Sequence, residues 1–397
     1  MTIASIAPVF ELGLNYWPRR RAMDMWCDFA LAEIADEFAH IASMGFDTVR
    51  VMAMTRDFLT GPASVSATMV DRLVRVARAA ADAGLGIVPT LVVINMSGRI
   101  WWPHWMLGAS GTPADLYADP AVLGAQALLA ERCSHALAGG ANIRAIDLAN
   151  EIDDAQRPAS RDAGRMWTSV LAAAIRRAAP GIPVQVGAHL PSLTTGNHMR
   201  VDDLAMVADE DMMHAYPLYS TSARHFLDPE LVPFSCALTS ALAARGRRTL
   251  MQEFGLCTAP RGSAGISITD DFLGTPRKQY LASEDEGAEY YDAVMSRLVA
   301  TGAAGAYAWC YADYDAGLWH RQPLDTAVRE RTFGLVRADG TEKPAVGVFR
   351  ELRARRDEGG VAPGDVPHVL DVSADEYYAS PGVHFDRLYA RWLEARA

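Results

Sequence analysis

The sequence predicts an α/β fold, a closed (β/α)₈ TIM barrel with a short C-terminal appendage. Three observations support this prediction. Short apolar runs alternate with amphipathic segments, eight such apolar runs follow one another, and 397 residues suit one large barrel domain. Alternation of strand and helix favours parallel strands. No G-x-G-x-x-G motif follows the first run, which weakens the alternative of a dinucleotide-binding open sheet.

The predicted strands are apolar, β-like runs, as expected for parallel strands that are buried on both faces. They lie in the stretches 12–17, 46–53, 86–94, 145–151, 184–188, 211–215, 248–255 and 305–311. The fourth stretch ends in Asn150-Glu151 and the seventh carries Glu253 near its end. The second carries Arg50 inside an apolar run, and a buried arginine needs an acidic partner or an anionic site.

The predicted helices follow these strands. In residues 29–44, Ile34, Phe38 and Ile41 recur at helical spacing, and Gly45 ends the segment. The other helices are expected at residues 69–83, 121–137, 164–179, 231–245, 286–300 and 345–355. Residues 95–119 form a long loop rich in tryptophan.

The chain divides into a predicted catalytic barrel, residues 1–355, and an appendage, residues 356–397. Residues 358–364 are rich in glycine and proline, as in a linker. Within the appendage, we expect a short strand at 368–372 and an amphipathic helix at 385–393. We expect this appendage to dock on the barrel rather than to form a second domain.

Composition narrows the class of protein. A net charge of −11 with no basic run argues against a nucleic-acid partner. The five cysteines are odd in number and widely spaced without a C-x-x-C motif, which predicts reduced thiols rather than disulfides or a zinc site. Residues 1–10 lack the features of a signal peptide, and no apolar run is long enough to cross a membrane. We therefore expect a cytoplasmic protein, and a homo-oligomer is left open.

Polar and aromatic residues gather where the predicted strands end. In a (β/α)₈ barrel, all of these ends open into one bowl, which holds the chemistry. A single glutamate or histidine there is more often a salt-bridge partner or a satisfied core residue than a catalytic group. The combination of many polar and aromatic residues at these ends favours an active site. They are Trp17, Arg50, Asn95, Asn150, Glu151, His189, His214, Tyr216, Glu253 and Trp309.

Two carboxylates that close different strands of one barrel suit the cleavage of a glycosidic bond. One carboxyl must protonate the leaving oxygen, and the other must attack the anomeric carbon as an anion. We assign Glu151 as the acid/base and Glu253 as the nucleophile. Asn150 is expected to donate to the sugar 2-hydroxyl. Arg50 and Tyr216 would hold Glu253 ionised, Trp309 would form the floor under the sugar ring, and the loop residues Trp101 and Trp102 would flank it.

The order and spacing of these motifs resemble the retaining glycoside hydrolases of clan A, most closely family 5. The motifs are Asn150-Glu151, His214-x-Tyr216, Glu253 and Trp309, and the resemblance covers about residues 12–350. It implies a (β/α)₈ barrel, net retention, no cofactor and no metal, an acid/base on the fourth strand and a nucleophile on the seventh. It also matches Arg50 to an active-site position. Asn95 is a departure, because family members often carry a histidine there.

The region after the eighth strand bears on the substrate. Residues 319–323, which include Trp319, together with 330–335 and 339–344, resemble the corresponding loops of exo-acting β-mannosidases. Long loops at both ends of the cleft would restrict it to a short oligosaccharide. The resemblance therefore implies an exo-acting β-mannosidase on short oligosaccharides.

Three alternatives remain open from the sequence. The first is an endo-acting β-1,4-mannanase, or a β-glucanase or β-glucosidase, of the same clan. The second is a metal-dependent sugar isomerase or epimerase, with a divalent ion held by Glu151, His189, His214 and Glu253. The third is a barrel that binds carbohydrate without catalysis, which the presence of both glutamates disfavours.

Overall fold

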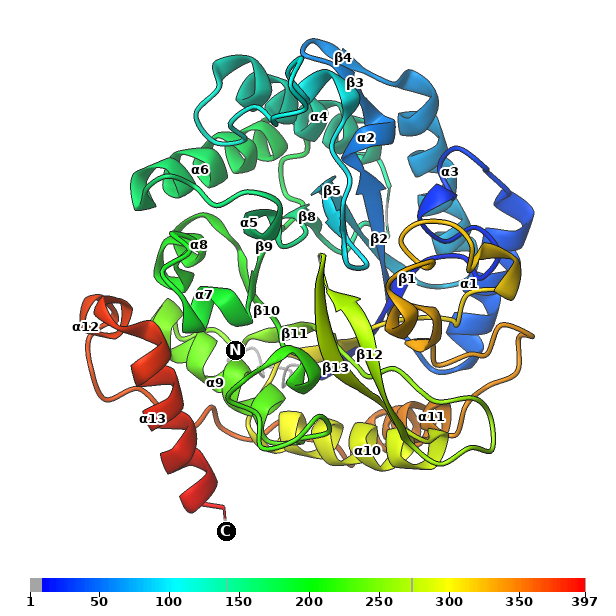
Figure 1. Ribbon diagram of the computed structural model, residues 1–397, viewed down its shortest axis with the longest axis vertical. Helices are drawn as coiled ribbons and strands as arrows, with labels where there is room; N and C mark the ends of the chain where they lie inside the picture. The colour runs from blue at the N-terminus through cyan, green and yellow to red at the C-terminus, as the bar shows by residue number, and fades with distance from the viewer. Residues whose placement is uncertain (1–8, 141, 273, 397) are drawn as a thin grey trace, which may run out of the picture.

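The computed structural model describes residues 9–140, 142–272 and 274–396. Eight parallel strands close into a barrel in the order β1-β14-β11-β10-β9-β8-β5-β2 (Figure 1). The strands are β1 (Glu11–Tyr16), β2 (Thr48–Met54), β5 (Gly86–Val93), β8 (Ile146–Ala149), β9 (Val184–His189), β10 (Glu210–His214), β11 (Leu250–Phe254) and β14 (Gly305–Ala308). The predicted (β/α)₈ barrel is confirmed. Most of the segment that we interpreted as free of a signal peptide lies outside the described residues.

A helix follows each strand and packs outside the barrel, as Figure 1 shows. These helices are α1 (Leu31–Ser43), α3 (Ala67–Asp82), α4 (Pro120–Leu137), α6 (Arg161–Ala178), α8 (Val201–Val207), α9 (Leu231–Ala243), α10 (Glu284–Ala300) and α11 (Ala345–Asp357). Helix α8 was not predicted. Its seven residues are too few to show a clear 3.6-residue period.

The additional elements lie between or after the barrel units. An antiparallel hairpin, β12 (Ile266–Phe272) with β13 (Thr275–Leu281), follows β11 and was not predicted. The C-terminal helices α12 (Ala374–Ala379) and α13 (Pro381–Glu394) pack beside α7 (Leu190–Thr194) and α9, at the lower left of Figure 1. The predicted C-terminal amphipathic helix is therefore present as α13.

The strand predicted at residues 368–372 is wrong, because this segment is irregular in the structure. A closed barrel has no free edge to which another strand could add. The segment is held by side chains instead. Val369 is buried and its carbonyl accepts from Arg391, while Asp371 pairs with Arg387 and Arg391 of α13.

The barrel interior changes from apolar to polar along its axis. Near the N-terminal ends of the strands, Val88, Ala145, Met212, Leu250 and Tyr307 form a small apolar cluster. Above it, buried polar side chains face one another, because alternate residues of a strand point to opposite sides. These residues are Asn15, Arg50, Thr90, Asp147, Gln185 and Gln252. Two of them contact strand-end residues directly, because Arg50 donates to Glu253 and Gln252 is hydrogen-bonded to His214.

Two further sequence predictions can be compared with the structure. All five cysteines are free, and four of them are buried. Within the part of the chain that the structure describes, no helix combines the length and the apolar character needed to cross a bilayer.

Candidate active site

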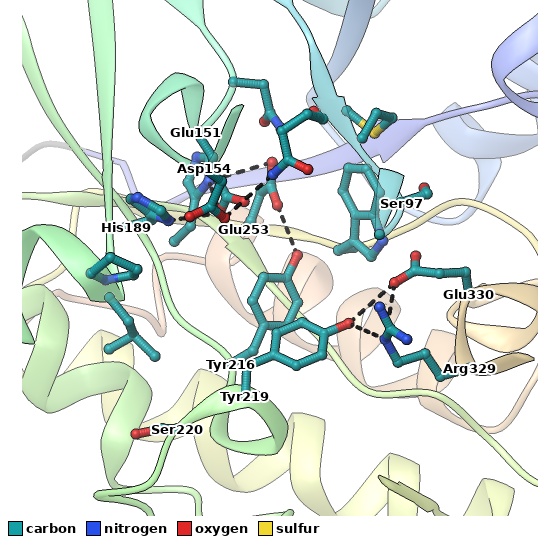
Figure 2. Close-up of a pocket in the computed structure, with 18 of the residues that line it drawn as sticks. Ser97, Glu151, Asp154, His189, Tyr216, Tyr219, Ser220, Glu253, Arg329 and Glu330 are labelled. Atoms are coloured by element: carbon teal, nitrogen blue, oxygen red, sulfur yellow. Dashed lines mark hydrogen bonds and ion pairs between the residues drawn. The ribbon is translucent and has the colours of Figure 1, made fainter. Parts of the chain in front are cut away.

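A cavity of about 300 Å³ opens at the C-terminal ends of the barrel strands (Figure 2). Its volume is at the lower end of the range for small-molecule sites. Eight residues that the sequence singled out line it: Asn95, Asn150, Glu151, His189, His214, Tyr216, Glu253 and Trp309. They come from six different strands or from the residues that directly follow them. The structure therefore brings most of the predicted site residues together.

Glu253, near the end of β11, is held by two donors. An Arg50 guanidinium nitrogen donates to Oε1, and the Tyr216 hydroxyl donates to Oε2 at 2.9 Å. The Glu253 side chain is only 5% exposed. Both contacts are made to carboxylate oxygens, so they orient the carboxylate and stabilise its negative charge. Burial and the charge of Glu253 raise the pKa of Tyr216 well above its usual value, so this hydroxyl remains a donor.

Arg50 is fully buried and has the acidic partners that the sequence required. Its Nη2 lies 2.8 Å from an Asp147 oxygen and 3.0 Å from Asn150 Oδ1. The same Asp147 oxygen accepts from the Thr90 hydroxyl at 2.7 Å. Burial alone would lower the pKa of Arg50, but the charges of Asp147 and Glu253 outweigh it and raise the pKa. Arg50 thus links the barrel interior to Glu253, and it is not among the described residues that line the cavity.

Glu151 follows β8 with a left-handed backbone, φ 40°, immediately before the short helix α5 (Ile152–Ala155). A left-handed glutamate is strained by about 1–3 kcal/mol, and such strain clusters at functional sites. Its side chain is 19% exposed. One Glu151 oxygen, one Glu253 oxygen and a His214 nitrogen all lie within 4.8 Å of one another. The two carboxylates therefore face the same space.

His214 bridges Glu151 to the polar interior. Its Nε2 lies 2.9 Å from Gln252 Oε1, and the Gln252 amide nitrogen donates to Gln185. Gln252 Oε1 is thus the acceptor, and His214 Nε2 carries a hydrogen. His214 Nδ1 lies 3.0 Å from Glu151 Oε1. One proton on this bond gives either an imidazolium with a carboxylate or a neutral imidazole with a protonated Glu151.

His189 places both ring nitrogens against carboxylates. Nε2 lies 2.9 Å from Asp153 and Nδ1 lies 3.7 Å from Glu151. Burial disfavours the cation, but the charges of Asp153, Asp154 and Glu151 outweigh burial and raise the pKa of His189 to about 10. Burial would raise the pKa of Glu151, but the charges of His189 and His214 and the His214 hydrogen bond outweigh it and lower this pKa. In the free protein, Glu151 is therefore held as a carboxylate between two imidazoles, of which His214 is hydrogen-bonded to it.

Asp153 and Asp154 are two titratable groups of this cluster that were not predicted as site residues. Asp154 lines the cavity, and its carboxylate accepts from the Asn95 amide at 3.4 Å. Burial, reinforced by the charges of Glu151 and Asp153, raises the pKa of Asp154 to about 6. Asp153 behaves oppositely. Burial opposes its charge, but the charge and hydrogen bond of His189 lower the pKa of Asp153.

The His189–Asp153 pair predicts a pH-dependent stability. The folded pKa of His189 is about 10 and the unfolded one about 6.5, so its contribution is fully present below about pH 6.5 and lost above about pH 10. His189→Gln should lower the free energy of unfolding by a few kcal/mol at pH 6, and the difference from wild type should shrink toward pH 10. Urea unfolding across this range measures it. His135→Gln, exposed on α4, is the control. A pH-independent difference would contradict the prediction.

The predicted tryptophans take different places. Trp309 lines the cavity and is 6% exposed. Trp17 donates to the Met96 sulfur at 3.4 Å, and Trp101 donates to the Met96 carbonyl at 3.1 Å. Both side chains therefore support the cavity wall from behind. Trp102 is half-buried and Trp319 is 37% exposed. Trp17, Trp101, Trp102 and Trp319 are not among the described residues that line this cavity.

One wall of the cavity was not predicted residue by residue. Arg329 and Glu330, in the segment after β14, lie beside Tyr219, whose hydroxyl donates to Glu330 at 3.2 Å (Figure 2). Asp270 of β12 accepts from Arg329 at 2.8 Å. Glu330 is 5% exposed, and burial raises its pKa although the charge of Arg329 opposes this. The sequence signal was the resemblance of residues 330–335 to a substrate-side loop.

Metal binding can be judged from the donor set. Two groups have ligand atoms within 4.8 Å of one another: Glu151, His214 and Glu253, and Glu151, Asp154 and His189. A ligating imidazole must offer an unprotonated nitrogen. Both nitrogens of His189 face carboxylates, and Glu253 already pairs with the Arg50 cation. The contacts of these described residues suit a protonated network better than a divalent ion.

No protein-family model matches this sequence, and a search of curated proteins finds no match. Solved structures do match. GH5_18 from Streptomyces cattleya, solved in complex with GlcNAc, has a TM-score of 0.80 at 21% identity and covers 97% of this chain and 92% of its own. Exo-beta-1,4-mannosidase Op5Man5 from Opitutaceae bacterium strain TAV5 has a TM-score of 0.75 at 26% identity, over 91% of this chain and 63% of its own.

The chain resembles glycoside hydrolase family 5. The resemblance inferred from the sequence is thus confirmed at the level of the fold. A further GH5_18 structure from Streptomyces cattleya, in complex with Manb1-4GlcNAc, has a TM-score of 0.78 at 21% identity, over 96% of this chain and 92% of its own. These neighbours support the prediction that the chain is a glycosidase.

Proposed function

We propose that this protein is a retaining glycosidase that removes a terminal β-linked mannose from a short oligosaccharide. The observation that carries the proposal is the pair Glu151 and Glu253. Their carboxylates line one cavity, with an oxygen of each within 4.8 Å of the other. A retaining enzyme needs its two carboxyl groups about 5–5.5 Å apart, whereas an inverting enzyme needs about 6.5–9.5 Å to admit a water molecule.

The reaction proceeds in two displacements. A Glu253 oxygen attacks the anomeric carbon while Glu151 gives its proton to the leaving oxygen, so the glycosidic bond breaks and a glycosyl ester forms. Glu151, now a carboxylate, then takes a proton from a water molecule whose oxygen attacks the same carbon. The ester bond breaks, Glu253 is released as a carboxylate, and the sugar keeps its β configuration.

The contacts of His214 suggest how Glu151 receives its proton for the first step. A bound sugar excludes water from the cavity, which disfavours the charged imidazolium–carboxylate pair relative to the neutral pair. Because Glu151 and His214 Nδ1 are 3.0 Å apart, one proton shift along this hydrogen bond produces the protonated carboxyl. His214 Nε2 keeps its hydrogen bond to Gln252 in both states.

The remaining contacts fit a pyranose ring. Trp309 offers an apolar ring face to the sugar. Asn150 accepts from Arg50 at 3.0 Å and donates one amide hydrogen to the Asn95 carbonyl at 3.2 Å. Its second amide hydrogen can be donated to the 2-hydroxyl, a contact that strengthens in the transition state. These roles are the ones proposed from the sequence.

Exo action is supported by the wall that Arg329 and Glu330 form. Arg329 is fixed by Asp270 of the β12–β13 hairpin, which also accepts from the backbone nitrogens of Val328 and Arg329 at 2.7 and 3.0 Å. This clamp holds Glu330 at the cavity surface beside Ser97 (Figure 2). We propose that the wall limits the cavity to one sugar on this side, with Glu330 accepting hydrogen bonds from hydroxyls of the terminal sugar.

Glu330→Gln should lower kcat/KM for the terminal mannoside by about 10–100-fold, because a hydrogen bond to a charged group contributes about 1.5–3 kcal/mol. The isosteric change keeps the shape of the wall. Steady-state kinetics on the β-mannoside measures the loss. Glu342→Gln, which alters a carboxylate paired with Arg350 away from the cavity, is the matched control. An unchanged kcat/KM in Glu330→Gln would remove this residue from sugar recognition.

The function is tested with β-mannoside, β-glucoside, β-galactoside, β-xyloside and α-arabinofuranoside of p-nitrophenol, together with Manb1-4GlcNAc and a β-mannan polymer. We expect cleavage of the β-mannoside and of Manb1-4GlcNAc, release of β-mannose as the first product, and no ladder of products from the polymer. A ladder would favour endo action. Inactivity on all substrates, with sugar isomerisation that EDTA abolishes and Mn²⁺ restores, would replace the proposal by the metal-dependent alternative.

A further inference from the structure

The C-terminal arm, which we define as α12 and α13, is fixed to the barrel by an aromatic cluster. Phe385, Tyr389 and Trp392 surround Phe234 of α9, with ring centroids 5.2, 5.0 and 5.6 Å from it. All four side chains are buried. Tyr389 also donates its hydroxyl to Asp228 at 2.7 Å. These contacts hold α13 against α9.

The arm touches α7, which is part of the cavity wall. Leu190, Pro191 and Thr194 of this short helix line the cavity. The last carbonyls of a helix have no partner within the helix. Here they accept from the arm, because Tyr377 donates its hydroxyl to the Leu193 carbonyl at 2.6 Å and Tyr378 donates to the Ser192 carbonyl at 3.1 Å. The arm therefore supplies donors to two of the last carbonyls of α7.

Tyr378 also fixes the segment that follows α7. Its hydroxyl accepts from the backbone nitrogen of Val201, the first residue of α8, at 2.9 Å. One hydroxyl thus joins the end of α7 to the start of α8. Residues 195–200 lie between these two points, and they include the buried Asn197. Asn197 thus lies in a segment that Tyr378 contacts near both ends.

Asn197 links this segment to the acid/base. Its amide nitrogen donates to Asp153 at 2.7 Å and to the Ser192 hydroxyl at 3.3 Å. Asp153 pairs with His189 at 2.9 Å, and the other nitrogen of His189 lies 3.7 Å from Glu151. A set of polar contacts, buried at Asn197, Asp153 and His189, therefore runs from the arm to Glu151.

We propose that Tyr377 and Tyr378 are positioning residues for the acid/base, and that the C-terminal arm orients Glu151 through α7, Asn197, Asp153 and His189. This inference rests on the proposed role of Glu151 in glycoside cleavage. Displacement of a catalytic group by about 1 Å can slow a reaction about 100-fold. An arm that fixes α7 and the Asn197 segment would prevent such a displacement, although it lies outside the cavity itself.

The test is the double variant Tyr377→Phe/Tyr378→Phe, which removes both hydroxyls and keeps both rings. We expect kcat/KM on Manb1-4GlcNAc to fall about tenfold and kcat/KM on an activated aryl mannoside to change less than about twofold, because only a poor leaving group needs the proton of Glu151. A merely structural defect would lower both by the same factor. Tyr389→Phe removes an arm hydroxyl that does not contact α7 and should leave both values unchanged.

A second measurement separates this inference from the proposed function. Titration of the His189 ring nitrogens by NMR in the full chain needs no activity. In the double variant the His189 midpoint should move toward the ordinary histidine value, because Asn197 no longer holds Asp153 in place, and Tyr389→Phe should titrate as wild type. An unshifted midpoint in the double variant, or equal losses on both substrates, would overturn the positioning role, whether or not the wild type cleaves mannosides.

Discussion

Glu253→Ala is expected to lower kcat by about 10⁴-fold or more on every glycoside that the wild type cleaves, which corresponds to about 5.5 kcal/mol of transition-state stabilisation. The loss should not depend on the leaving group, because the missing bond is the one formed to the anomeric carbon. Arg50 keeps its contacts to Asp147 and Asn150 in this variant, so the fold should persist. Circular dichroism and a thermal melt check this.

The chemistry of rescue identifies the role of Glu253 more sharply than the loss does. In Glu253→Ala, azide can occupy the space of the missing carboxylate and attack an activated aryl β-mannoside from that side. The expected product is the α-mannosyl azide, with inverted configuration. The matched control is Glu210→Gln, a carboxylate at the opposite end of β10 that pairs with Arg144, and it should keep wild-type turnover. Normal rates in Glu253→Ala would assign the nucleophile elsewhere.

The barrel was predictable because its signals are local and repeated. Each buried strand reads as an apolar run, and each long helix shows apolar residues at helical spacing, so the eight strands could be counted without knowledge of their contacts. The elements that were missed or wrong lack such signals. Strand β13 begins with four exposed residues in a row instead of an alternation of buried and exposed side chains. Helix α8 is too short to show a period. The strand expected at 368–372 needed a free sheet edge to pair with, and a closed barrel has none.

The candidate site was predictable as a set of strand-end residues but not as a network. Arg50 inside an apolar run required an acid, and the structure supplies Asp147 and Glu253 from two distant strands. Which carboxylate pairs with which imidazole depends on distances of a few tenths of an ångström. The pairing of His189 with Asp153 therefore has no signature in the sequence. The same is true of the contacts of Tyr377 and Tyr378 with α7, which join residues more than 180 positions apart.

Glu151→Ala is expected to lower kcat/KM on Manb1-4GlcNAc by about 10²–10⁴-fold and on an activated aryl mannoside by less than about tenfold, because general acid catalysis matters only for a leaving group that needs a proton. On the activated substrate, attack by Glu253 still forms the glycosyl ester. Its hydrolysis slows because no base activates water. A burst of the aryl alcohol followed by slow turnover should therefore appear in a rapid-mixing experiment.

Azide distinguishes the two carboxylates. In Glu151→Ala it needs no general base and attacks the glycosyl ester from the face opposite Glu253, so the expected product is the β-mannosyl azide, the anomer opposite to that from Glu253→Ala. Asp154 is the competing candidate, because its pKa of about 6 would also suit an acid. If Asp154→Asn gave the leaving-group-dependent loss and Glu151→Ala lost both substrates equally, the acid would be Asp154. The His214 bond at 3.0 Å favours Glu151, since it connects this carboxyl directly to a proton source.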